Sequence, residues 1–224
     1  MKSLKKYIQL IRNNFTLNPQ HLFFFFRHAL TLFLLNLETK KQFADNYGDF
    51  HRERNLRDYR LANPRSEGGA ILGEVVWFVS SVDVGQGKIL FAGDRNDVKE
   101  IWSKFFRTEQ MVTCGLHDMD HRWNFEFSPP ESLRSMRFHL IVSQAMIEHL
   151  IDPFKHICDL VSLLDHGGIL VIHSVLPGFF YHRVPIDCLR FYPDWFETVA
   201  SRLGLVVLDR QISVFNITYK LQKP

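Results

Sequence analysis

Three histidines in the second half of the chain are the side chains best suited to move a proton near neutral pH. His149 follows the apolar run Phe138–Val142. His173 directly follows the run Ile169–Ile172, and His182 lies in the loop after that run. A free imidazole has a pKa of about 6.5, so modest surroundings make it an acid or a base. We therefore take all three as candidates for a general base. A buried, hydrogen-bonded structural role is the alternative for His149.

Small, polar and acidic residues lie at the ends of three apolar runs, which are KILFAG, Met111–Cys114 and again Phe138–Val142. In an open parallel sheet, ligands bind just beyond the carboxyl ends of the strands, so the residues directly after each run are the candidates for binding. These candidates are Gly93, Asp94, Asp118, Asp120, Ser143 and Gln144. For Asp94 a second role is open, as a cap for the helix that we expect to begin at Val98.

A polar loop between Leu116 and Arg122 holds residue types that bind metals. His117, Asp118, Asp120 and His121 together offer imidazole and carboxylate ligands. Their spacing matches no strict ligand pattern, so we expect a polar loop and no metal here.

The elements that position these residues alternate between strand and helix. The run Phe138–Val142 predicts a buried strand, and apolar residues from Phe154 to Leu164 recur at helical spacing. Gly167 and Gly168 are expected to end that helix, and Ile169–Ile172 predicts the next strand. A strand, helix, strand series of this kind is usually a right-handed parallel crossover.

The end of the chain predicts a reversal of strand direction. A helix over Pro193–Leu203 is followed by two apolar stretches, Leu205–Asp209 and Ile212–Leu221, which only Arg210 and Gln211 separate. Because a parallel return needs about a dozen residues, strands with so short a connection must be antiparallel.

Three segments carry a resemblance to a known family. They read VSQAMIEHLIDPF, LLDHGGILVIHSV and PIDCLRFYPDWFE. Together they resemble the second half of class I S-adenosylmethionine-dependent methyltransferases, and the third is similar to small methyltransferases often encoded with glycan-synthesis enzymes. The resemblance covers roughly residues 86–215. It implies an α/β fold, a Rossmann-like doubly wound mostly parallel sheet with a C-terminal antiparallel strand. It also implies S-adenosylmethionine as cofactor and a small-molecule or glycan-linked acceptor.

The same resemblance implies roles for the residues at the strand ends. Asp94 would bind the amino group of the cofactor, Asp118 would hold both ribose hydroxyls, and Asp120 competes with it for a cofactor contact. Ser143 and Gln144 would line the methionine end. In the third segment, Asp187 and Arg190 are expected to form an ion pair that fixes the loop.

The first strand departs from the family pattern of an acidic residue followed by alternating glycines. Only Gly93 matches, because Phe91 stands at the acidic position and Arg95 and Asp97 stand at the later glycines. A side chain where the backbone must approach a ligand closely obstructs it. A catalytically inactive binding or assembly subunit of the same fold is therefore the alternative function.

The first 69 residues form a predicted helical extension, with a possible lid, before a domain over residues 70–224. Asn18 and Pro19 begin a predicted helix of about 18 residues that is apolar around much of its circumference. Residues 1–65 also carry a net charge of +7. We expect this helix to pack on the domain, a second subunit or a protein partner, with peripheral membrane contact as the other hypothesis.

Several classes of protein are disfavoured. Three cysteines without a CxxC motif favour a reducing compartment over a disulfide framework. The apolar stretch Leu22–Leu37 is interrupted by Arg27 and His28 and is shorter than the roughly 20 residues that cross a bilayer. No secretory signal is recognisable, so we expect a cytoplasmic protein. No motif for sequence-specific nucleic-acid binding, phosphate-binding loop or nucleophile elbow is present.

Overall fold

The computed structural model describes residues 30, 34, 37, 41, 61–62, 70–71, 73–183, 186–213 and 215–224. The chain forms two compact units, residues 1–49 and residues 50–224. In the first unit Leu30, Leu34, Leu37 and Lys41 are helical and exposed. Most of the predicted extension and the predicted lid lie outside the described residues, so the boundary at residue 69 stays a prediction.

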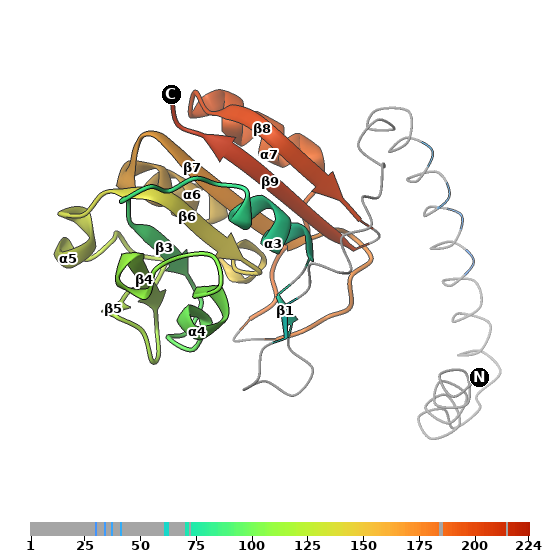
Figure 1. The fold of residues 1–224 in the computed structure, drawn as a ribbon. Coiled ribbons are helices and arrows are strands. Elements are labelled where there is room, and N and C mark those ends of the chain that lie inside the picture. Colours follow the sequence, from blue (N-terminus) through green and yellow to red (C-terminus); the bar gives the residue numbers. More distant parts are fainter. Residues whose placement is uncertain are drawn as a thin grey trace, which may run out of the picture. The chain divides into compact units, whose positions relative to one another are not determined.

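A seven-stranded sheet forms the centre of the second unit (Figure 1). Its strands are β3 (Ile89–Ala92), β4 (Met111–Gly115), β5 (His121–Arg122), β6 (Phe138–Gln144), β7 (Leu164–Val175), β8 (Val206–Ile212) and β9 (Asn216–Gln222). They lie in the order β5-β4-β3-β6-β7-β9-β8. A separate two-stranded pair joins β1 (Leu61–Ala62) to β2 (Ala70–Ile71).

The strand directions confirm the predicted fold class. The five strands β5, β4, β3, β6 and β7 are parallel to one another. The strand β9 is antiparallel to both of its neighbours, β7 and β8. Six strands therefore run one way and β9 alone runs the other. This is the Rossmann-like, mostly parallel sheet with a C-terminal antiparallel strand that the resemblance implied.

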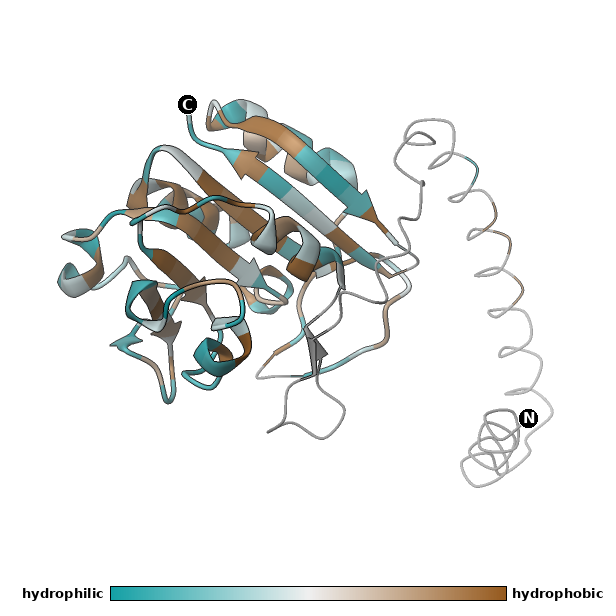
Figure 2. Cartoon of the chain, in the orientation of Figure 1, coloured by the Kyte–Doolittle hydropathy of each residue, from teal (hydrophilic) through white to brown (hydrophobic). Residues whose placement is uncertain are grey.

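Helices cover both faces of this sheet. They are α3 (Gly73–Ser80), α4 (Val98–Trp102), α5 (Glu131–Arg134), α6 (Pro153–Leu163) and α7 (Pro193–Arg202), with short 3-10 turns η3 (Thr108–Gln110) and η4 (Ile147–His149). In Figure 1, α3 crosses in front of the sheet, and α6 and α7 lie behind it. Because both faces are covered, the central strands are apolar along nearly their whole length, as Figure 2 shows.

Two predicted boundaries are wrong. The helix α6 ends at Leu163, before the glycine pair, because Leu164 is extended and already pairs with Phe138. Gly167 and Gly168 lie instead where the β6–β7 register shifts. The C-terminal turn lies after Ile212 rather than at Arg210, because β8 continues to pair with β9 through buried Gln211 and Ile212.

Candidate functional site at the carboxyl edge of the sheet

The register of the sheet brings the predicted strand-end residues to one edge. Ala92 pairs with Cys114 on one side and with Ser143 on the other, and Gln144 pairs with His173. The segments that follow β3, β4, β6 and β7 therefore leave the sheet side by side. This is the edge where ligands of parallel sheets bind.

Gly93 begins the turn after β3 in a conformation that favours glycine. Its φ is +95°, and its N–H donates a 2.8 Å hydrogen bond to the carbonyl of Cys114. A Cβ atom at this position would lie 2.4 Å from Cγ of Met146. The one glycine that matches the family pattern is thus required by the backbone, and the space above it is occupied by the Met146 side chain.

Asp94 is a half-buried carboxyl group. Among the described residues it has no hydrogen-bond or ion-pair partner. Desolvation by burial, with a smaller contribution from the nearby charge of Asp97, raises its pKa to about 7. It does not cap α4, because Asp97 occupies the position before that helix. An unpaired carboxylate at this edge is suited to accept hydrogen bonds from a cationic ligand group.

The two bulky replacements in the glycine pattern turn away from this edge. Phe91 is fully buried in the core on the side of α3 and α4, and its ring stacks on Trp102 at a centroid distance of 5.7 Å. Arg95 points outward, with 66% of its side chain exposed, and lies 3.4 Å from Asp118. Neither side chain fills the space beyond β3.

The two acidic candidates after β4 have different surroundings. Asp118 has a φ of +54°, its carboxylate is 58% exposed, and its carbonyl accepts a hydrogen bond from the Asn96 N–H. Asp120 instead accepts hydrogen bonds from Lys99 Nζ at 2.5 Å and from the Thr113 N–H at 2.9 Å. Burial acts to raise the pKa of Asp120, but these bonds outweigh it and lower the pKa. Asp120 thus joins β4 to α4, and Asp118 is the carboxylate that is available to a ligand.

Of the two candidates at the end of β6, Ser143 already has a partner within the chain. Ser143 is buried, and its hydroxyl lies 3.4 Å from Nε2 of His156. Gln144 is half-buried at the end of β6. The next residue, Ala145, has a φ of +49° and donates to the carbonyl of His173, which turns the chain sharply toward η4.

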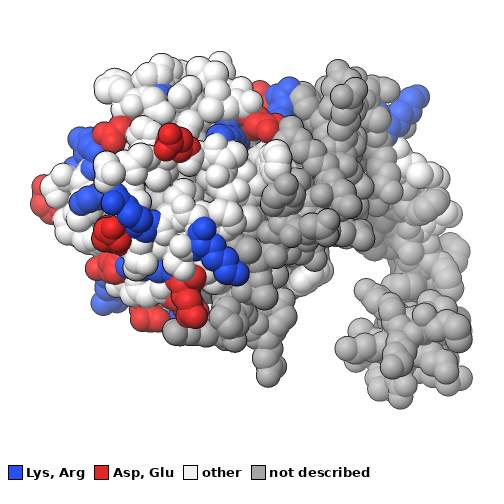
Figure 3. Space-filling view, viewed as in Figure 1, with Lys and Arg blue, Asp and Glu red and all other residues white. Residues whose placement is uncertain are grey.

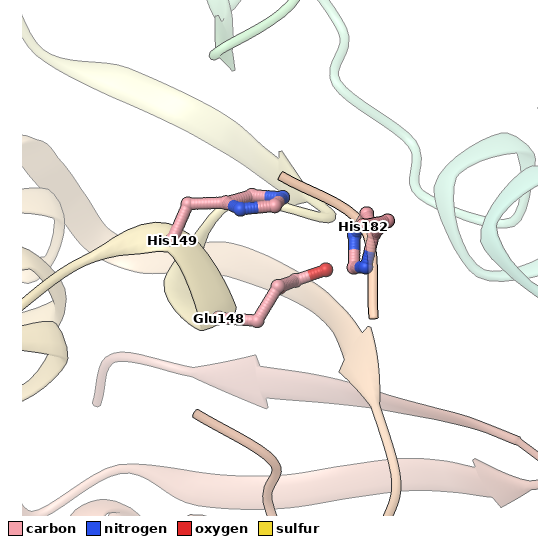
Figure 4. A group of neighbouring side chains, drawn as sticks. All are labelled: Glu148, His149 and His182. Carbon is pink, nitrogen blue, oxygen red and sulfur yellow. The ribbon is translucent and has the colours of Figure 1, made fainter. Parts of the chain in front are cut away.

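Two of the three histidine candidates meet, and a buried glutamate lies with them. Glu148, His149 and His182 each offer one ligand atom, and these atoms lie within 4.8 Å of one another. Figure 4 shows Glu148 and His149 pointing from η4 toward His182 in the loop after β7. The rings of His149 and His182 are 4.8 Å apart, nearly edge to face.

His173 lies apart from this pair, within the sheet. It is 3% exposed, it belongs to β7, and its Nε2 lies 3.2 Å from the side-chain oxygen of Asn216. Desolvation lowers its pKa to about 4, although the bond to Asn216 acts in the other direction. The His173 imidazole is therefore neutral at pH 7, and within β7 it is a weak base.

The loop that carries His182 is held by a buried ion pair. Asp187, with 1% of its side chain exposed, accepts two hydrogen bonds from the guanidinium of Arg190, which confirms the predicted pair. It also accepts the His182 N–H at 2.7 Å. The guanidinium bonds, helped by that N–H and opposed by burial, hold the pKa of Asp187 well below its usual range.

Sequence reasoning missed three residues of this edge. Glu148 received no role from the sequence, although it is a fully buried carboxyl group. Met146 and Met119 were not singled out, yet their side chains approach Gly93 and Gly115 closely. The pair Glu148–His149 was a usable signal, whereas methionine carries no pattern that distinguishes such a position from core.

Charged side chains are mixed on the face of the second unit that Figure 3 shows. Lysine and arginine alternate with aspartate and glutamate there, without a continuous patch of one sign. Among the described residues, no helix is long and apolar enough to cross a membrane.

Comparisons with known proteins detect similarity in structure only. No family model matches the chain, and neither does any curated protein. Solved structures do match at the level of the fold. A Listeria monocytogenes protein classed as an S-adenosylmethionine-dependent methyltransferase has a TM-score of 0.53 and 7% identity, covering 66% of this chain and 96% of that one. The chain therefore has a methyltransferase-type fold.

A protein named for a different reaction also matches the fold. The [4+2]-cyclase SpnF matches with a TM-score of 0.51 and 11% identity, over 73% of this chain and 86% of that chain. An O-methyltransferase family protein from Burkholderia thailandensis has a TM-score of 0.49 and 10% identity over 67% of this chain. This chain spans only 55% of the length of that protein. A fold of this type does not by itself specify methyl transfer.

Proposed function

We propose that the protein binds S-adenosylmethionine at the carboxyl edge of β3, β4 and β6 and transfers its methyl group to a small-molecule or glycan-linked acceptor. The observation that carries the proposal is Asp94, a half-buried carboxylate without a partner among the described residues, beside Gly93 at positive φ. Unpaired charge at a desolvated position is costly unless a ligand completes it. The Listeria protein of the same fold, which is classed as S-adenosylmethionine-dependent, supports the choice of ligand.

The residues present fit such a ligand at two points. Asp94 would accept hydrogen bonds from the ammonium group, whose positive charge favours the ionised carboxylate. Asp118 would accept both ribose hydroxyls, since a carboxylate offers two acceptor oxygens and this one is exposed beyond β4. Its present partner, Arg95, is also exposed, and a surface ion pair of this kind is easily exchanged for another bond.

S-adenosylmethionine, when bound, supplies an electrophilic methyl group on a sulfonium. The chain then has to hold the acceptor in line with that methyl group and take up a proton from the acceptor. His149 and His182 are the candidates for the proton, because they face one another at the same edge. Desolvation makes His173 a weaker candidate, since its pKa is lowered to about 4.

Exposed aromatic residues beside His182 support an organic acceptor at this edge. Phe180 is 69% exposed and Tyr181 is 71% exposed, and both directly precede His182. The ring of Phe179 stacks on Phe180 at 4.4 Å and lies 5.1 Å from the His182 ring. Aromatic faces of this kind bind apolar ligands and the apolar faces of sugars, so they favour an organic acceptor next to the histidines.

A non-catalytic binding or assembly subunit remains the second candidate function, and one observation favours it. Met146 lies over Gly93, and Met119 lies over Gly115, each closer than van der Waals contact to the place that a Cβ atom of the glycine would take. These side chains occupy the approach to the turn that a cofactor would need. Methionine is flexible, so binding requires them to adopt other rotamers.

Calorimetric titration of the full chain with S-adenosylmethionine and with its demethylated product tests the proposal. We expect saturable binding of both, weakened about tenfold or more in Asp118→Ala, because a hydrogen bond to a charged group contributes about 1.5–3 kcal/mol. Glu109→Ala is the matched control, since Glu109 forms a comparable exposed pair with Arg107 at 3.5 Å. It should bind like the parent.

The two candidate functions give different results. Absence of heat with millimolar ligand in a folded chain would contradict cofactor binding and favour the non-catalytic subunit. Binding that Asp118→Ala and Glu109→Ala weaken equally would place the ligand elsewhere.

A further inference from the structure

A buried glutamate without a full set of partners lies at the centre of the cluster after β6. Glu148 is 0% exposed, and only its Oε2 is bonded, to the Ser174 hydroxyl at 2.8 Å. Its Oε1 is buried and has no hydrogen-bond partner in the described part of the chain. Leaving a buried acceptor unsatisfied costs roughly 1–3 kcal/mol, and more if the group is charged. Oε1 of Glu148 is therefore an acceptor that a further group could bind.

The two histidines beside it are oriented by the chain. Nδ1 of His149 donates to the carbonyl of Ile186 at 2.5 Å, which leaves the Nε2 lone pair of His149 free to bind another group. Nδ1 of His182 is buried and has no hydrogen-bond partner in the described segments, and Oδ2 of Asp187 lies 3.4 Å from it. A carboxylate or carbonyl behind each imidazole is the arrangement that metal-binding histidines have, since it fixes the tautomer.

We propose that Glu148, His149 and His182 bind a divalent first-row transition metal ion. Two imidazoles and one carboxylate suit ions such as Zn²⁺, Mn²⁺, Fe²⁺ and Co²⁺. In a tetrahedral site, ligands about 2.0–2.2 Å from an ion lie roughly 3.3–3.6 Å apart, so atoms now within 4.8 Å of one another must approach by up to roughly 1.5 Å. His182 lies outside the helices and strands, so rotation of its side chain toward an ion breaks no backbone hydrogen bond of the sheet. Three protein ligands leave coordination positions open.

The site has a second layer of contacts that would hold its ligands. The Ser174 hydroxyl bonds to Oε2 of Glu148, the Ile186 carbonyl accepts from His149, and Asp187 accepts the His182 N–H. An ion with open positions at this edge would bind an oxygen of a small molecule and lower the pKa of a bound hydroxyl. With an ion bound, His149 and His182 would act as ligands and not as acceptors of the proton. The proposal does not depend on methyl transfer, because metal binding is measured without cofactor or acceptor.

Titration of the untagged, chelator-treated full chain with Co²⁺ tests the site, because visible absorption reports the ligands and geometry of bound cobalt. We expect one tight equivalent with absorption typical of nitrogen and oxygen ligands, and competition by Zn²⁺. In Glu148→Gln and in His182→Ala, affinity should fall at least about tenfold, a change equal to 1.4 kcal/mol. His166→Asn changes an exposed histidine outside the cluster and is the matched control.

Glu148→Gln is the decisive variant, because it keeps the shape of the side chain and removes a buried charge. We expect it to be at least as stable as the parent without metal, so that loss of binding cannot be attributed to unfolding. Absence of a tight equivalent in the parent would overturn the proposal. So would cobalt spectra and affinity that are the same in the parent and in Glu148→Gln.

Discussion

Asp94 is the residue whose chemistry departs most from its sequence context. Exposed aspartate has a pKa near 3.8, but desolvation raises the pKa of Asp94 to about 7. The folded chain therefore binds a proton here that the unfolded chain releases above about pH 4. The unfavourable effect of ionisation on stability begins near that pH and is complete above pH 7.

The first prediction concerns this charge. Asp94→Asn should match the parent in stability near pH 4 and exceed it at pH 8.5. A pKa raised from 3.8 to about 7 corresponds to about 4 kcal/mol. Because Asp94 is only half-buried, we expect the free energies of unfolding to differ by about 2 kcal/mol, or the melting temperatures by roughly 4–8 °C. Thermal unfolding at the two pH values measures it. A difference in melting temperature that does not change with pH would contradict it.

At the scale of the elements, the irregular segment between β7 and α7 is held in place by the pair Asp187–Arg190. Leu189 and Cys188 also donate backbone hydrogen bonds to the carbonyl of Glu148. These contacts join the loop after β7 to η4 and so place His182 beside His149. The site at this edge depends on that connection.

The second prediction concerns this loop. Arg190→Ala leaves Asp187 almost fully buried without its bidentate partner, so we expect a loss of about 2 kcal/mol in the free energy of unfolding at pH 7. Because the folded pKa of Asp187 is lowered, the stabilising effect of the pair is present above the unfolded pKa near 4 and decreases as the pH falls below it.

Chemical denaturation at pH 7 and at pH 3 measures this effect. The difference between Arg190→Ala and the parent should be smaller at pH 3. Arg134→Ala, which breaks the exposed pair with Glu131 on α5, is the control and should change stability by less than about 0.5 kcal/mol. Equal losses in the two variants would show that the loop does not depend on Asp187–Arg190.

At the scale of the whole molecule, the first unit carries an apolar face. Leu30, Leu34 and Leu37 are 59%, 55% and 49% exposed, and their spacing places them on one side of a helix. Leucines exposed in a row are unfavourable in water and typical of a surface that binds something. We propose that this face associates with a second copy of the chain, and peripheral membrane contact is the other hypothesis.

The third prediction follows from that proposal. A variant with Leu30→Gln, Leu34→Gln and Leu37→Gln should be smaller in size-exclusion chromatography with light scattering than the parent chain, because the apolar area that drives association is removed. Sedimentation with anionic lipid vesicles distinguishes the hypotheses. A parent that is monomeric but sediments with vesicles would contradict self-association.

Much of the fold was predictable because buried strands and amphipathic helices leave periodic patterns. The apolar runs at β3, β4, β6 and β7 and the helix α6 were recognisable in this way, and the short connection before β9 required an antiparallel strand. The exact ends were less predictable. Helix α6 stopped before its glycines because Leu164 pairs with Phe138, a contact between residues distant in the chain.

The sequence by itself determined the alternation of elements and the edge of the sheet where polar residues gather, because both follow from the local order of side chains. Only the tertiary structure decided which of those residues act together. It assigned Asp120 to a bond with Lys99, left Asp94 without a partner among the residues that the structure describes, and brought His182 to Glu148 across more than thirty residues of chain. Desolvation and partner distance depend on how the strands pack side by side, and that arrangement is not contained in any local pattern.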